Sequence, residues 1–177
     1  MTAGAPSDES SEATPDGAAL APWEAALESA LDRAQREAAA TAAGGGSVVV
    51  PLGAVGDLVL HGATVDGVGV RADTLRWRPA ATPRAPLGQR ADAVARHLAA
   101  PLGGPLAPIE VDARLNRATL RTPLPALRRG RFWHVELEFD GAVAIERYRV
   151  VAGERHREPL TLTREQLRDA LEGLSEV

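Results

Sequence analysis

The residues best suited to chemistry are His134, Glu136 and Glu138, which alternate with Val135 and Leu137. Successive side chains of a β-strand point to opposite faces, so this spacing places the three polar groups on one face. A histidine with two carboxylates could begin a metal site or supply acid–base catalysis. Same-face positions of one strand are about 6.5 Å apart, so one strand alone does not bring three ligands to one ion.

A salt-bridged surface explains the same residues more simply. Arg147 and Arg149 are predicted on the same face of the next strand, where they would form cross-strand ion pairs with the carboxylates. Glu110 and Asp112 form a second same-face pair, which we interpret as the polar side of an amphipathic strand. We therefore assign no catalytic residue and no metal ligand, and we expect no cofactor.

These residues belong to two alternating runs, 131–139 and 142–151, which flank Asp140-Gly141. That dipeptide is typical of a two-residue hairpin turn of type I′. The register that follows pairs Trp133 with Tyr148 across the hairpin and puts these large side chains on its more buried face: Trp133, Leu137, Phe139 and Tyr148. The opposite face mixes apolar and charged groups, and we predict that it binds a partner through Phe132, His134, Glu136, Ile145, Arg147 and Arg149.

Large apolar groups on a charged face gain nothing in a solvated monomer, so Phe132 and Ile145 should be covered. The cover could be the helix that begins near Pro22, in the same chain or in a second copy. We therefore predict a non-catalytic protein-binding or assembly module that acts through a protein partner or as a homo-oligomer. The alternative is a small-ligand-binding protein or a hydrolytic enzyme that uses the His134 and Glu136 face.

A second alternative is an arginine-rich nucleic-acid-binding domain. Guanidinium groups bridge phosphates, and a neighbouring aromatic ring can stack on a base. Trp77 alternates with two arginines, so we expect it to point into the core with Leu75 and to leave the arginines solvated. Nucleic acid is therefore not the partner we expect, although the candidate residues are Arg76, Arg78, Arg128, Arg129 and Arg131.

Composition excludes several classes of site. The 177-residue chain has no cysteine, which rules out disulfides, iron–sulfur clusters and cysteine nucleophiles. It has no lysine either, so Schiff-base lysines and the phosphate-loop lysine are excluded. No apolar run approaches the roughly 20 residues that span a bilayer, and no signal-peptide pattern occurs. We expect a cytoplasmic protein without membrane contact.

The chain divides into three parts by composition. Residues 1–21 are acidic and nearly devoid of large apolar side chains, so we predict a disordered tail. Residues 22–46 are predicted as an alanine-rich helix and a glycine linker, and the narrow apolar stripe of the helix suggests weak docking. The remaining residues, 47–177, form the predicted domain.

Within the domain, short strands are predicted over residues 47–78, and a helix over 88–99 with Arg90 off its apolar face. A second hairpin is expected over 109–122, and Thr163 with Gln166 has the spacing of a capping box that opens a last helix. The turns are too short for parallel crossovers. The predicted fold is a single α+β domain, a mainly antiparallel sheet built from hairpins with two or three helices packed against it.

Overall fold

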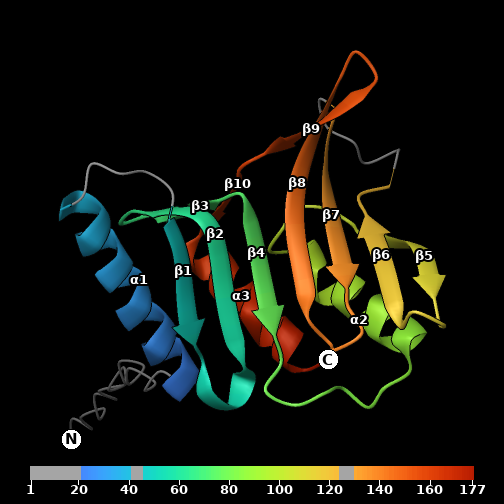
Figure 1. Ribbon diagram of the computed structural model, residues 1–177, viewed down its shortest axis with the longest axis horizontal. Helices are drawn as coiled ribbons and strands as arrows, with labels where there is room; N and C mark the ends of the chain where they lie inside the picture. Colours follow the sequence, from blue (N-terminus) through green and yellow to red (C-terminus); the bar gives the residue numbers. More distant parts are fainter. Residues whose placement is uncertain (1–20, 41–45, 124–129) are drawn as a thin grey trace, which may run out of the picture.

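In the computed structural model, the described residues, 21–40, 46–123 and 130–177, form three α-helices and ten strands (Figure 1). The helices are α1 (Pro22–Ala40), α2 (Leu87–Ala99) and α3 (Arg164–Ser175). The strands are β1 (Gly46–Pro51), β2 (Asp57–Val65), β3 (Gly69–Ala72), β4 (Thr74–Arg78), β5 (Ala107–Asp112), β6 (Arg117–Arg121), β7 (Arg131–Leu137), β8 (Val143–Val151), β9 (Glu154–Glu158) and β10 (Leu160–Thr163). The predicted tail, 1–21, lies outside the described residues except for Ala21, as does most of the glycine linker.

The strands form one antiparallel sheet in the order β10-β3-β2-β4-β8-β7-β6-β5, with β1 paired to β2 and β9 paired to β8. Most neighbours along the chain are also neighbours in the sheet, because short turns join them. The predicted fold class, α+β with an antiparallel sheet and packed helices, is confirmed. Strand β5 ends this order and is an edge strand.

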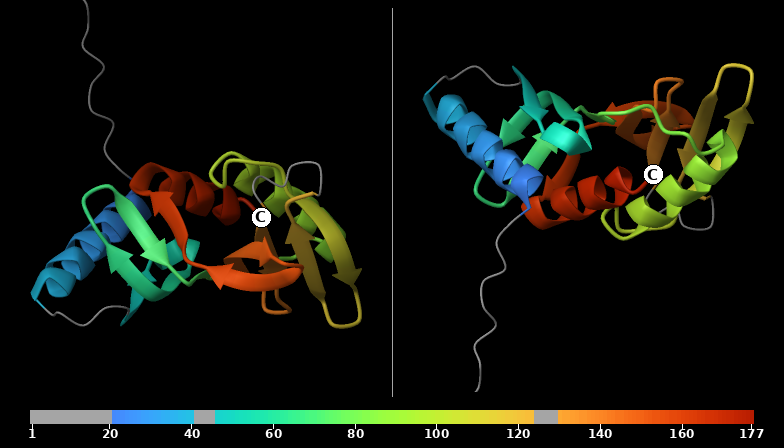
Figure 2. Two further views of the ribbon diagram at one scale, coloured as in Figure 1. Left: turned by 90° about the horizontal axis from the view of Figure 1, so that it is seen from above. Right: turned by 90° about the horizontal axis from the view of Figure 1, so that it is seen from below.

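The three helices lie on the same side of the sheet (Figure 2). Leucines of α2 and α3, among them Leu98 and Leu171, share one buried cluster with Leu75, Val135 and Ile145 of the sheet. No described helix covers the opposite side, which we call the open face (Figures 1 and 2). The sheet therefore has a buried helix side and an open face.

Helix α1 packs closely against the domain, whereas its narrow apolar stripe suggested weak docking. Leu27 and Leu31 are fully buried in the common core. Arg164 of α3 also donates hydrogen bonds to Glu28 and Asp32 of α1, each at 2.7 Å. Two leucines and an ion-pair cluster dock a helix whose stripe is otherwise mostly alanine. Because α1 lies on the helix side, it does not cover the open face.

The other two helices follow their predicted limits. Gln166 donates its backbone N–H to Thr163 Oγ1 at 3.1 Å, and its side-chain oxygen accepts from the backbone N–H of Thr163, which completes the predicted capping box. In α2, the placement of Arg90 off the apolar face is wrong, because Arg90 is only 3% exposed. Burial lowers the pKa of Arg90, against an opposing attraction from Asp140.

The central hairpin forms, but its predicted turn is wrong by one residue. Glu138 donates its N–H to the carbonyl of Ala142 at 2.8 Å, and Gly141 donates to the carbonyl of Glu138 at 3.0 Å. Gly141 has a φ of 93°, as expected for a three-residue loop that ends in a glycine bulge. Leu137 consequently pairs with Val143 instead of Ala144.

The two-residue turn with positive φ occurs elsewhere. Ala152 and Gly153, with φ of 51° and 87°, connect β8 to β9. This hairpin is not predicted from the sequence, because alanine is not a typical residue at positive φ.

A register shift of one residue exchanges the faces of β8 relative to β7. Ile145 therefore lies on the helix side and is fully buried, which corrects its placement on the charged face. Tyr148 pairs with Phe132 and not with Trp133, so it lies on the open face and not on the buried side where it was predicted. Phe139, predicted on the buried side, is 70% exposed in the turn.

Candidate functional site

The open face is a surface of paired charges. Arg117 of β6 contacts Glu136 of β7 at 2.6 Å, and Arg76 of β4 contacts Glu138 just beyond β7. Arg157 of β9 forms an ion pair with Glu146 of β8, which also accepts a hydrogen bond from the Tyr148 hydroxyl at 2.7 Å. The hydrogen bond to Glu146 and burial raise the pKa of Tyr148 above its ordinary value. Cross-strand ion pairs are present, but the predicted partners are wrong: Glu136 and Glu138 pair with Arg117 and Arg76, and neither Arg147 nor Arg149 contacts them.

The six residues predicted to bind a partner do not form one surface. Register places three of them, Phe132, His134 and Glu136, on the open face. The other three lie on the helix side of β8, where Ile145 is in the core and the Arg147 guanidinium lies 5.3 Å from the centre of the Trp133 ring. The Nη1 atom of Arg149 lies 3.9 Å from Oε1 of Glu158 in β9.

Phe132 is covered by its own neighbours. Its ring stacks on Tyr148 with 5.5 Å between ring centres, and the Arg121 guanidinium lies 5.9 Å from the ring centre. Phe132 is 7% exposed as a result. Phe132 and Ile145 therefore need no partner to cover them.

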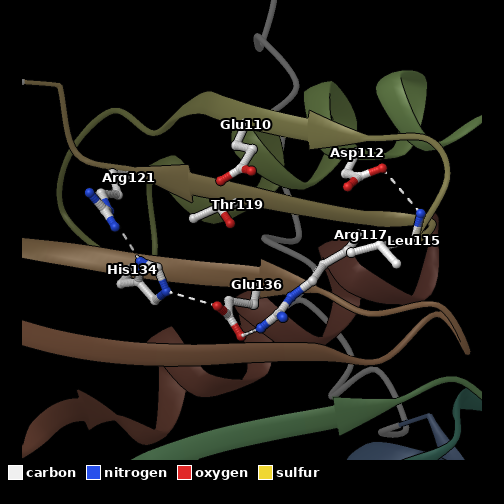
Figure 3. A pocket seen from close by; sticks show the side chains of 8 residues that line it. All are labelled: Glu110, Asp112, Leu115, Arg117, Thr119, Arg121, His134 and Glu136. Atoms are coloured by element: carbon white, nitrogen blue, oxygen red, sulfur yellow. Dashed lines mark hydrogen bonds and ion pairs between the residues drawn. The ribbon is translucent and has the colours of Figure 1, made fainter.

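A polar groove lies on the open face over β5, β6 and β7 (Figure 3). Its volume is about 270 Å³, and three of the carboxylates discussed above line it. The lining residues are Glu110, Asp112, Leu115, Arg117, Thr119, Arg121, His134 and Glu136. A chain of hydrogen bonds crosses the groove floor. Arg121 Nε donates to His134 Nδ1 at 3.2 Å, and His134 Nε2 lies 3.2 Å from Glu136 Oε1.

The charges of this groove largely satisfy one another. A guanidinium only donates, so Nδ1 of His134 accepts and Nε2 carries the proton that is donated to Glu136. Burial would raise the pKa of Glu136, but hydrogen bonds from Arg117 and His134 outweigh it, and the pKa is lowered. Glu136 is held ionised, and neither nitrogen of His134 is available as a base without loss of a contact. Among the described residues, no group of three or more His, Asp or Glu side chains is placed to hold a metal ion.

The arginines proposed for nucleic-acid binding are also paired with carboxylates. Arg76 contacts Glu138. The Nε atom of Arg78 lies 3.7 Å from Asp140 Oδ2, and the Nε atom of Arg131 lies 2.9 Å from Glu158 Oε2. The other two candidates, Arg128 and Arg129, fall outside the described residues. Trp77 points into the core with Leu75, as predicted, and is 3% exposed.

The β5 edge is a feature that sequence reasoning missed. Ile109 and Val111, which were expected to belong to an amphipathic strand with a buried side, are 53% and 47% exposed. Leu115 and Phe139, in the two neighbouring turns, are exposed as well, and Asn116 Nδ2 donates to the carbonyl of Phe139 at 3.0 Å. No sequence signal marks this edge, because strand order alone makes β5 the last strand.

The fold and these surfaces define an antiparallel α+β protein with an ion-paired open face and a free edge strand. Comparison with protein-family models, curated proteins and solved structures gives no match. None of the described helices has the length and apolar character needed to cross a membrane.

Proposed function

We propose that the protein is a non-catalytic protein-binding or assembly module, and that the β5 end of the sheet is its binding site. One observation carries the proposal. Strand β5 has no neighbour on its outer side within the described chain, and it exposes two large apolar side chains, Ile109 and Val111. Unpaired backbone groups beside exposed apolar groups are the features that protein partners use at sheet edges.

Small-ligand binding or hydrolysis is the second candidate, because the groove brings His134, Glu136, Glu110 and Asp112 together. It ranks second because the hydrogen bonds of His134 and Glu136 are already made within the protein. A general base needs a nitrogen or oxygen that is free to reach the substrate. Nucleic-acid binding is not proposed, because the described candidate arginines have carboxylate partners.

Site-specific photo-crosslinking in the native cell tests the proposal. A benzophenone-bearing amino acid in place of Ile109 should crosslink a defined protein, either a second copy of the chain or another protein. The same amino acid in place of Val68, which is exposed in the β2–β3 turn, is the matched control and should not crosslink that protein. Absence of a protein adduct specific to position 109 would contradict the proposal.

Light scattering over a concentration series separates the two forms of the proposal. Growth of the mean mass with concentration indicates self-association. A constant monomer mass, together with an adduct at position 109, indicates a different protein as partner. A constant monomer mass without such an adduct would move the ligand-binding candidate to first place.

A further inference from the structure

We propose that β5 accepts an extended segment of a different protein as an added strand, and that this segment alternates basic and apolar residues. The inference rests on the proposed protein-binding function and specifies its partner. It is carried by the position of β5 at the sheet edge, by the side chains on its two faces, and by their charge.

The two faces of β5 differ in chemistry. Glu110 pairs with Thr119 and Asp112 pairs with Arg117, so both carboxylates lie on the open face, beside the groove (Figure 3). Val111 pairs with the buried Ala118 and lies on the helix side. A strand added outside β5 would meet the two carboxylates on one face and Val111 on the other.

The charge of Glu110 is the least compensated in the groove. Within the described chain its side chain makes no hydrogen bond or ion pair, and its attraction to Arg117 is shared with the closer Glu136. Asp112 accepts backbone N–H groups of Arg114 and Leu115 at 2.8 and 3.1 Å. A basic side chain of an added strand would lie opposite these carboxylates at cross-strand distance.

A second copy of the chain fits this edge poorly. Twofold pairing of β5 with itself, centred on Glu110 or on Val111, would place Glu110 opposite Glu110 or Asp112 of the other copy. Like charges directly opposite each other in a sheet are destabilising. A partner with basic residues at alternate positions avoids this repulsion.

Strand β9, another short edge strand with charged side chains, lacks the apolar residues that alternate with the carboxylates in β5. Its sequence, Glu-Arg-His-Arg-Glu, has no apolar side chain to pack against an added strand. In β5, a bulge between Pro108 and Glu110 interrupts the regular ladder to β6, so we expect the added segment to pair with the stretch from Glu110 onward.

The test uses a short fluorescent peptide that alternates arginine and valine, titrated with the full chain and followed by anisotropy. The N–H groups of alternate residues point to one edge of a strand, and only one edge can bond to β5. N-methylation of all arginines and N-methylation of all valines should therefore differ. One modification should weaken binding by roughly tenfold or more through loss of the peptide N–H bonds to β5, and the other should leave it nearly unchanged.

Charge reversal tests the residue assignment. Glu110→Arg should weaken binding of this peptide by roughly fivefold and strengthen binding of a peptide that alternates glutamate and valine. Glu154→Arg makes the same change at the exposed edge strand β9 and should alter neither affinity. Circular dichroism spectra that match wild type establish that both variants are folded.

The results separate the inference from the function on which it rests. Equal effects of the two N-methylation patterns, or wild-type affinity of Glu110→Arg for the arginine peptide, would overturn strand addition even if position 109 still crosslinks a protein. Crosslinks from position 109 to a second copy alone would also overturn it and leave an assembly function. Absence of any protein adduct at position 109 would instead contradict the proposed protein-binding function itself.

Discussion

Glu136 shows how a single residue links the open face to pH. Its pKa is lowered below the ordinary value of 4.5, since hydrogen bonds from Arg117 and His134 outweigh the effect of burial. A carboxyl whose pKa falls on folding contributes stability above its unfolded pKa, and this contribution is lost as pH falls through the folded pKa. The ion pair with Arg117 therefore stabilises the protein at neutral pH and not in acid.

We expect Glu136→Gln to lower the free energy of unfolding at neutral pH by about 1 kcal/mol, because a charged hydrogen-bond acceptor is replaced by a neutral one. The difference from wild type should narrow as pH falls below 4.5. Urea denaturation at a series of pH values measures both quantities. A difference that stays constant down to about pH 2 would refute the role assigned to this carboxylate.

Arg90 is a buried charge, and its replacement by an apolar side chain of similar length should not harm the fold. It is 3% exposed, and its Nε has no hydrogen-bond partner in the described structure. Arg90→Met keeps the length of the side chain and removes the desolvated charge, so stability should stay equal or rise by about 1 kcal/mol. Arg90→Ala should lose about 2 kcal/mol through the cavity it leaves. Denaturant unfolding distinguishes the two, and a Met variant as unstable as the Ala variant would show that the charge itself is needed.

At the scale of elements, the β7–β8 turn depends on a glycine with two constraints. Gly141 has a φ of 93°, and a Cβ there would lie 2.4 Å from Cδ of Pro83. Gly141→Ala should therefore combine backbone strain with a steric clash and lower the free energy of unfolding by about 3 kcal/mol.

Gly153 is the matched control, with a φ of 87° and no atom within 4 Å of a Cβ. Gly153→Ala should cost only the strain, about 1 kcal/mol. Thermal or denaturant unfolding of both variants gives the comparison. Equal losses would mean that the contact between the turn and the Pro79–Pro83 segment adds nothing.

In the β5–β6 hairpin, the alternation of residues predicts the two strands but not their position in the sheet. A hairpin over 109–122 was predicted, and β5 and β6 form it at nearly those residues. Their alternation does not reveal whether another strand follows. The exposure of Ile109 and Val111 follows from the place of β5 at the end of the sheet.

At the scale of the whole molecule, α1 belongs to the same folding unit as the sheet. Leu31 is fully buried in the core that all three helices share. Leu31→Ala should lower the free energy of unfolding of the whole domain by about 3 kcal/mol in one cooperative transition. Arg33→Ala, an exposed change on the same helix, should have little effect. A separate early unfolding transition for α1 would instead indicate the weak docking that its apolar stripe suggested.

Residues close together in the sequence were enough to determine many of the local features of this protein. The apolar period of α2, the Thr163 and Gln166 capping box of α3, and the burial of Trp77 between two arginines depend on residues a few positions apart. Short turns between alternating runs were enough to predict an antiparallel α+β fold. These features follow from helix and strand geometry, which neighbouring residues decide.

The tertiary structure decided which surface is available. A single bulged residue at Gly141 set the register that moved Ile145 into the core, and the covering of Phe132 depends on Tyr148 and Arg121 from other strands. The docking of α1 and the free edge at β5 depend on which elements meet across long stretches of chain. Sequence periodicity assigns a residue to one of two faces, but the free energy of packing the whole core decides which face is buried and which strand lies last.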